Sequence, residues 1–417
     1  MRFRDFHKNI KIRIVETFMS SLIGSMIFPF MAIYLAFHFG AKVAGLLLVI
    51  NVFIGIGISF VGGYFGDQFG RKKIMVFAET LRFAAFTTMA LCNSPWFESP
   101  EITFMMMTIN SICWGLAGPA DQAMLIDVST PEQRKFMYSI TYWSSNLSIA
   151  LGGIVGAFMF KHHLFELLSA LSVMALVTSV LVIFFIDESY KPEVSKVNAA
   201  KHVIQLFTNY ATVMRDRLFI LFTAASILVL SMEFQLTNYI GIRLSDEMTQ
   251  QPFLYWHING VNMMGILRTE NTIIVALLMV FITRLTGRFK DARVLVVSCV
   301  VYTIGYGIIA YSNNIWLLFA MMAMLTIAEV ARVPVEQTYM SSLPPDNARS
   351  SYMAFGGLRF NLSMLISSLA VTAGAFLPPL VMAVLITCVG LAGSFLYMMI
   401  TPGLESRKTA HEIDRAG

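Results

Sequence analysis

Pro119-Ala120-Asp121-Gln122 in the first half of this 417-residue chain has a counterpart, Pro334-Val335-Glu336-Gln337, in the second half. The two stretches align when the sequence is shifted by 215 positions without a gap, and the same shift aligns the Asn-Leu-Ser triplets at 146–148 and 361–363. Polar and helix-bending residues in an apolar background do not match through shared hydrophobicity, so the alignment indicates an internal duplication. Duplicated halves in a membrane protein predict two bundles and point to a transporter.

The composition is that of a chain surrounded mostly by lipid. Hydrophobic residues make up 57% of the sequence, charged residues 13%, and the mean hydropathy is +0.68. Apolar stretches of about 18–25 residues, the length that crosses a bilayer as a helix, recur along the chain. We therefore expect an all-α membrane protein with twelve transmembrane helices in two pseudo-symmetric bundles of six. The predicted spans are 12–38, 43–65, 74–92, 102–126, 136–160, 164–186, 218–242, 263–285, 294–312, 316–340, 350–374 and 379–401.

The distribution of Lys and Arg predicts the orientation, because cytoplasmic loops retain positive charge. With both termini inside, the inner loops and tails hold 23 of these residues and the outer loops hold four. We expect an N-terminal bundle at 1–186, a cytoplasmic linker at 187–217, and a C-terminal bundle with a short cytoplasmic tail at 218–417. The net charge of +5 reflects this topology and does not indicate a nucleic-acid partner.

The chemistry of the remaining residues argues against several other classes of protein. All four cysteines fall within predicted spans and are interpreted as small apolar packing residues. The adjacent histidines His162 and His163 have no cluster of Cys or carboxylate residues beside them, so we expect neither a metal site nor a cofactor. A membrane-embedded enzyme is the alternative from another class, but no nucleophile elbow, phosphate loop or metal cluster supports it.

A glycine-rich basic loop joins the second and third predicted spans, with the sequence Gly63-Tyr64-Phe65-Gly66-Asp67-Gln68-Phe69-Gly70-Arg71-Lys72-Lys73. The glycines permit a tight turn, and the basic cluster holds the loop in the cytoplasm. Asp67 can accept a charge-assisted hydrogen bond or face a helix N-terminus. The pattern Gly-x-x-x-Asp-x-x-Gly-Arg-Lys/Arg-Lys/Arg resembles the signature loop of the major facilitator superfamily. The resemblance implies the major facilitator fold over the whole chain.

Four segments resemble more closely the LmrP-type drug/proton antiporters of that superfamily; they lie at 71–77, 124–129, 142–148 and 326–329. The resemblance implies a conformational latch in which Asp67, Arg71 and Asp127 take part. It also implies that Glu329 in predicted span ten acts in proton coupling and in recognition of cationic drugs. The latch candidates are Gly63, Asp67, Gly70, Arg71, Lys72 and Asp127.

Ionisable side chains inside predicted spans are costly and are therefore functional candidates. Glu329, Arg332 and Glu336 follow at i, i+3 and i+7, so one helical face presents them in sequence. A static ion pair with Arg332 is the structural alternative, but one arginine cannot fully pair with both acids, which favours a functional Glu329. Asp121 is equally compatible with a structural role and with coupling. The proton-coupling candidates are Glu329, Asp127, Glu233, Glu336 and Asp121.

The remaining ionisable residues have simpler interpretations. Glu79 and Arg82 are expected to pair and to serve mainly as structure, and Glu16 either forms an interfacial pair with Arg13 or takes part in coupling. Arg359 is a counter-charge whose partner the sequence does not identify. The candidates for the substrate cavity are Glu329, Glu233, Arg332, Arg359, Trp143 and Asn146.

These features predict a multi-pass transporter of the bacterial cytoplasmic membrane that works by alternating access and exports amphiphilic or cationic drugs in exchange for protons. The proton gradient is the expected energy source, and the expected partners of the monomeric chain are a small-molecule substrate, protons and membrane lipid. Thr141 and Thr237 replace two acids of the resembling antiporters, and Glu233 lies about one turn from Thr237. These departures leave open a narrow-specificity transporter of an endogenous metabolite, peptide or lipid.

Overall fold

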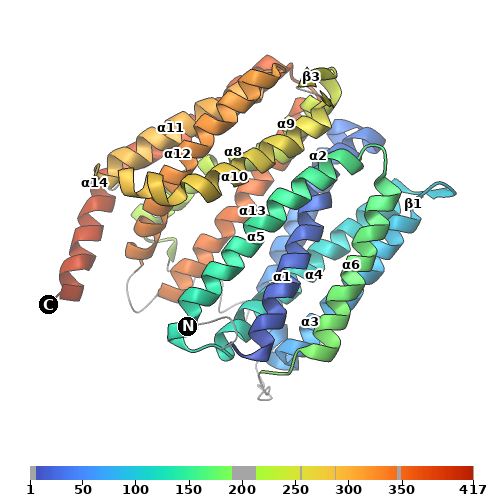
Figure 1. Ribbon diagram of the computed structural model, residues 1–417. Coiled ribbons are helices and arrows are strands. Elements are labelled where there is room, and N and C mark those ends of the chain that lie inside the picture. The colour runs from blue at the N-terminus through green and yellow to red at the C-terminus, as the bar shows by residue number, and fades with distance from the viewer. Residues whose placement is uncertain (1–5, 190–212, 254–255, 287, 345–348, 417) are drawn as a thin grey trace. The chain divides into compact units, whose positions relative to one another are not determined.

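The computed structural model describes residues 6–189, 213–253, 256–286, 288–344 and 349–416, and most of them are helical (Figure 1). Two short antiparallel hairpins, β1–β2 (Asn93–Ser94 and Phe97–Glu98) and β3–β4 (Gln251–Phe253 and Trp256–Ile258), interrupt the helices. The helices are α1 (Lys8–Ile27), η2 (Phe28–Phe30), α2 (Met31–Phe69), α3 (Arg71–Leu91), α4 (Pro100–Asp127), α5 (Pro131–Met159), α6 (Leu164–Phe185), α8 (Arg217–Thr237), α9 (Tyr239–Glu247), α10 (Gly260–Thr286), α11 (Asp291–Ile309), α12 (Ile315–Ser342), α13 (Arg349–Gly374) and α14 (Pro379–Ala416).

Eight helical segments within the described ranges are long and apolar enough to cross a membrane. The longest, Lys8–Ile58, contains both the first predicted span and most of the second. Every one of the twelve predicted spans overlaps a helix, but helices α4, α5 and α13 are not among the eight segments. The count of twelve membrane-spanning helices and the inward orientation of both termini therefore stay predictions.

The chain forms two compact units, one of residues 1–38 and 50–203 and the other of residues 39–49 and 204–417. The first boundary lies next to Gly40, where helix α2 is kinked and the backbone has a φ of 76°. Glycine adopts this conformation without the steric cost that other residues incur. The bundle boundaries expected from sequence stay predictions, and most of the predicted linker, residues 190–212, lies outside the described residues.

Close packing of α1 against α5 organises the first unit, where α3 also packs on α4 and α6 (Figure 1). A Cβ atom at Gly152 would meet the Ser25 hydroxyl, and one at Gly156 would meet the Met26 carbonyl and lie 2.6 Å from the Phe30 ring. The glycines therefore allow the two helix backbones to approach, as Gly-xxx-Gly spacing does in membrane helices.

The second unit packs α11 on α12 and α14, and α8 on α13 and α14. Its interior is aromatic: Phe222 and Tyr397 are fully buried, with ring centroids 5.6 Å apart. Tyr302 and Tyr306 are also buried and lie 5.0 Å apart in an edge-on arrangement. The Phe222–Tyr397 contact joins α8 to α14, whereas Tyr302 and Tyr306 both belong to α11.

The sequence repeat has a structural counterpart in each unit. Pro119 and Pro334 lie inside α4 and α12, and the aligned serines form matching bonds. The Ser148 hydroxyl of α5 donates to a main-chain carbonyl of α1 at 3.0 Å, and the Ser363 hydroxyl of α13 donates to one of α8 at 2.9 Å. Repetition of the Asn-Leu-Ser triplet therefore reflects the same helix-to-helix bond made twice.

Candidate functional site

Arg13 of α1 is the centre of a buried ionic group in the first unit. It pairs with Glu16, one turn away on the same helix, and with Asp121 of α4 at 3.2 Å. The Arg13 and Glu16 side chains are 6% and 3% exposed, and that of Asp121 is 22% exposed. The sequence left Glu16 between an interfacial pair with Arg13 and a role in coupling; the structure contains the pair with Arg13 and places it in the same buried group as Asp121.

The same group continues through a serine to α3 and α6. The Ser20 hydroxyl donates to Glu16 at 2.6 Å and accepts from the Arg82 guanidinium at 2.5 Å. Arg82 pairs with Glu79 at 3.0 Å, which confirms the pair expected from sequence, and Glu79 accepts from the Thr178 hydroxyl at 2.8 Å. We call these residues the N-terminal network; it joins four helices and comprises Arg13, Glu16, Ser20, Glu79, Arg82, Asp121 and Thr178.

Glu336 of α12 is the corresponding centre in the second unit. It pairs with Arg332 of its own helix and with Arg359 of α13 at 3.1 Å, and it accepts from the Ser226 hydroxyl of α8 at 2.5 Å. The Arg332 guanidinium also lies 5.1 Å from the centre of the Tyr302 ring, within cation–π range. Glu336 is therefore the partner of Arg359 that the sequence did not identify.

Glu329 has a different environment on the same helix. Its carboxylate accepts from the Asn271 amide of α10 at 2.7 Å, and that amide also donates to the Thr326 hydroxyl at 3.0 Å. In the described part of the chain Glu329 forms no ion pair, because Arg332 contacts Glu336 instead. A neutral amide thus holds Glu329, and Arg332, which pairs with Glu336, acts on it only at longer range.

Glu233 of α8 lies within electrostatic range of Glu329, Arg332 and Arg268. Its side chain is exposed at the surface of the second unit and forms no ion pair among the described residues. Like charges destabilise each other, and Arg332 and Arg268 offset part of the repulsion between the two acids, so Glu233 and Glu329 are together a candidate site for a positive charge. The sequence identified both acids but not Asn271, which orients one of them.

Two further cavity candidates, Trp143 and Asn146, belong to α5 of the first unit. The Trp143 side chain is exposed and that of Asn146 is half-buried. Their place in a substrate cavity stays a prediction.

The predicted latch residues lie at the ends of α2, α3 and α4. Arg71 pairs with Asp127, whose carboxylate also accepts from the Ser189 hydroxyl at 3.2 Å. Glu188 accepts from the main-chain N–H groups of Arg71 at 3.2 Å and Lys72 at 3.1 Å, so a carboxylate caps the N-terminus of α3. Sequence reasoning did not identify Glu188 and Ser189, since their polar neighbours suggested only a linker.

The remaining candidates of the predicted latch include Gly63, Asp67 and Gly70. Gly70 connects α2 to α3 with a φ of 95°, a conformation that favours glycine. Gly63 and Asp67 belong to helix α2, but their side-chain surroundings lie outside the described residues. Among the described side chains, Arg71 and Asp127 are in contact as the predicted latch requires.

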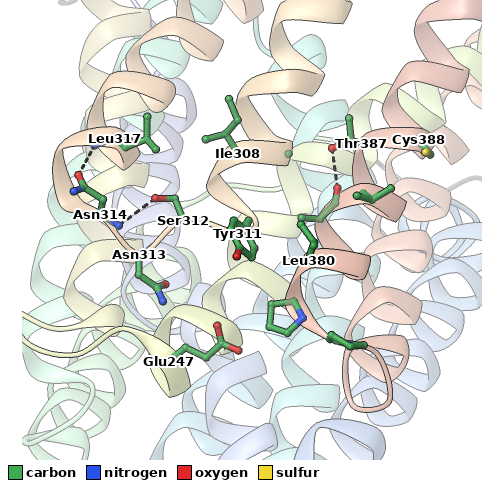
Figure 2. A pocket seen from close by; sticks show the side chains of 15 residues that line it. Glu247, Ile308, Tyr311, Ser312, Asn313, Asn314, Leu317, Leu380, Thr387 and Cys388 are labelled. Carbon is green, nitrogen blue, oxygen red and sulfur yellow. Dashed lines mark hydrogen bonds between the residues drawn. The ribbon is translucent and has the colours of Figure 1, made fainter.

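A cavity of about 990 Å³ opens between α11 and α14 of the second unit (Figure 2). Figure 2 shows Glu247 and Asn313 at one end of it and Thr387 and Cys388 at the other, with Ile308 on α11. None of the predicted substrate-cavity residues lines this pocket. The pocket is therefore separate from Glu233, Glu329, Arg332 and Arg359 of the same unit.

Comparison with known proteins supports the family expected from the signature loop. The sequence profile of the Major Facilitator Superfamily matches residues 15–267. A Na(+), Li(+), K(+)/H(+) antiporter of Planococcus maritimus is 33% identical over 388 residues, covering 90% of this chain and 92% of the relative. Multidrug resistance protein MdtH of Salmonella typhimurium is 22% identical over 337 residues, covering 80% and 78%.

Solved structures agree at the level of the fold. A crystal structure of the peptide transporter POT in complex with sulfate has a TM-score of 0.77 and 14% sequence identity, covering 98% of this chain and 96% of that one. The nucleoside transporter NupG has a TM-score of 0.69 and 12% identity, covering 94% and 99%. With the duplicated halves, the signature loop and the apolar helices, these similarities show that the chain belongs to the major facilitator superfamily of membrane transporters.

Proposed function

We propose that the protein is an antiporter that exchanges protons for a monovalent cation across the bacterial cytoplasmic membrane by alternating access. The observation that carries this proposal is the pair of acids Glu233 and Glu329, which lie in mutual electrostatic range without an ion pair among the described residues. Two carboxylates near the middle of membrane helices require compensating positive charge, which either protons or a bound cation supplies. Mutually exclusive occupancy by these two ligands is the physical basis of antiport.

The surroundings of the two acids favour a small hard cation as the cargo. The carboxylates of Glu233 and Glu329 and the Thr326 hydroxyl supply oxygen ligands of the kinds that bind hard cations, while the Asn271 NH2 group donates to both Glu329 and Thr326 and orients them. The Planococcus relative, a Na(+), Li(+), K(+)/H(+) antiporter, agrees with this choice. An alkali metal ion is accordingly the first candidate for the cargo, and it is a substrate rather than a resident cofactor.

Export of cationic drugs is the second candidate. The similarity to MdtH favours it, and the exposed indole of Trp143 offers a face for an organic cation. In both cases the proton gradient supplies the energy, about 2.3 kcal/mol for each charge moved through 100 mV. We further propose that the pair Arg71–Asp127 acts as a latch that one conformation makes and the other breaks, and that the protein works as a monomer.

The test is transport by purified protein in liposomes under an imposed pH gradient. Radioactive Na⁺, Rb⁺ as a substitute for K⁺, and the permanently charged dye ethidium are followed separately. The proposal expects gradient-driven flux of at least one of them, and its loss in Glu329→Gln and Glu233→Gln. Glu247→Gln, which removes an acid from the separate pocket between α11 and α14, is the matched control and is expected to keep the flux.

The outcomes separate the candidates. Flux of Na⁺ or Rb⁺ that ethidium does not inhibit assigns the alkali-ion function, whereas flux of ethidium alone assigns drug export. If folded and inserted protein moves none of the three cations, antiport of these cations is wrong and the narrow endogenous substrate becomes the better hypothesis.

A further inference from the structure

The N-terminal network contains more negative than positive groups. It has three carboxylates, on Glu16, Glu79 and Asp121, and two guanidinium groups, on Arg13 and Arg82. Among the described residues, these are the charged groups that α1, α3 and α4 present to one another in this network. A surplus of one negative charge among buried side chains is costly, so the network requires one additional positive charge.

The hydrogen bonds indicate which carboxylate carries that charge. Glu16 and Glu79 each contact a guanidinium and also accept from a hydroxyl, of Ser20 and Thr178 respectively. Asp121 contacts Arg13 through one oxygen, and its other oxygen, Oδ1, is shielded from solvent without a hydrogen-bond partner in the described part of the chain. Asp121 is therefore the least compensated acid of the network.

A proton suits this position better than a metal ion does. An alkali ion needs several oxygen ligands and would lie beside the Arg13 guanidinium, 3.2 Å from the same carboxylate. A proton neutralises Asp121 without ligands and leaves Arg13 paired with Glu16. The contrast with Glu329, which is held by a neutral amide, separates a proton site in one unit from a cation site in the other.

We infer that Asp121 and the N-terminal network form a second proton-binding site, distinct from the cation site at Glu233 and Glu329, and that its proton is carried in each transport cycle. The inference rests on the proposed antiport. It predicts that the number of protons exchanged per cation is larger by one than the cation site alone would give. Loss of Asp121 should lower this number while the cation continues to bind and move.

The reversal point of transport measures the proton number directly. In liposomes held at zero membrane potential by a permeant anion, net Na⁺ flux stops when the Na⁺ gradient balances the pH gradient. For a gradient of one pH unit, each coupled proton contributes a factor of ten to the balancing Na⁺ ratio. Asp121→Asn, which imitates the protonated acid, is expected to lower that ratio tenfold, whereas Glu101→Gln, at the exposed first turn of the same helix, is expected to leave it unchanged.

Each result decides the inference. An unchanged ratio in Asp121→Asn overturns it, and so does a folded, inserted variant that shows neither net flux nor exchange of radioactive Na⁺ for Na⁺, because asparagine would then fail to replace the protonated acid. Should Asp121→Asn not fold, Asp121→Glu is expected to keep the wild-type ratio and to shift the pH profile of the flux; an unshifted profile overturns the inference. Absence of gradient-driven Na⁺ flux in the wild type contradicts Na⁺/H⁺ exchange itself and with it the inference.

Discussion

Replacing Glu336 by glutamine tests whether this acid is mainly a structural centre of the second unit. Its side chain is 7% exposed and contacts Arg332, which is 3% exposed, and Arg359, which is 28% exposed. Glu336→Gln keeps the shape but removes the charge, so two guanidinium groups lose their shared anion. We expect a marked loss of stability, because an uncompensated charge is left in a buried position.

The magnitude follows from the exposure of the two arginines. Removing one partner of a buried ion pair costs about 3–5 kcal/mol, and the partly exposed Arg359 contributes little beyond that because solvent screens it. The expected loss is about 3–4 kcal/mol. For a unit of roughly 200 residues this lowers the unfolding temperature by on the order of 10 °C, at about 2–4 °C per kcal/mol.

The assay is thermal unfolding of the purified protein in detergent, followed by tryptophan fluorescence. Glu329→Gln is the matched control on the same helix: glutamine can still accept from Asn271, so we expect a change below about 1 kcal/mol. Replacing both members of the pair, Arg332→Met with Glu336→Met, should recover part of the loss, since it leaves no unpaired guanidinium at position 332. Equal destabilisation by Glu336→Gln and Glu329→Gln, or none by either, would refute the distinction between the two acids.

Three further predictions concern helix packing, the inner turn and the latch. Gly156→Leu should cost about 1–3 kcal/mol by forcing α1 and α5 apart, whereas Gly118→Ala, where an added Cβ has open space around it, should be tolerated; both are read by thermal unfolding. Gly70→Ala should cost roughly 1–3 kcal/mol because its φ of 95° strains any other residue, and equal unfolding temperatures for variant and wild type would contradict this. Arg71→Asp should slow transport in liposomes, and adding Asp127→Arg should restore part of the rate if the ion pair matters for the cycle; a double variant no faster than the single one would count against the latch.

The general architecture could be predicted from the sequence because the signals for it are strong and repeated. Long apolar stretches mark helices wherever lipid is the surroundings, and each of the twelve predicted spans overlaps a helix in the structure. The spacing of Gly152 and Gly156 permits a close helix contact but does not identify α1 as the partner, whereas the pair Glu79–Arg82 follows from their separation by three residues. Both features depend only on the spacing of residues within one helix, which can be read from the sequence.

Contacts between distant parts of the chain could not be predicted in the same way. Arg13 and Asp121 are 108 positions apart, and no local sequence pattern identifies them as partners. Asn271 beside Glu329 was missed because asparagine is unremarkable in sequence until the acid it orients is known. Glu188 was missed for a related reason: its role as the cap of α3 depends on where the chain returns after α6.

The duplicated halves share their helix arrangement but differ in their ion pairs, and this difference bears on the function of each half. Asp121 and Glu336 occupy equivalent positions in the repeat, yet Glu336 is held by two arginines and a serine while Asp121 contacts Arg13 alone among the described residues. Two identical units would carry the same side chains and could not bind a proton in one unit and the transported cation in the other. Under our proposal, this unequal compensation lets Asp121 take up and release a proton in each cycle, whereas Glu336 remains paired with its two arginines.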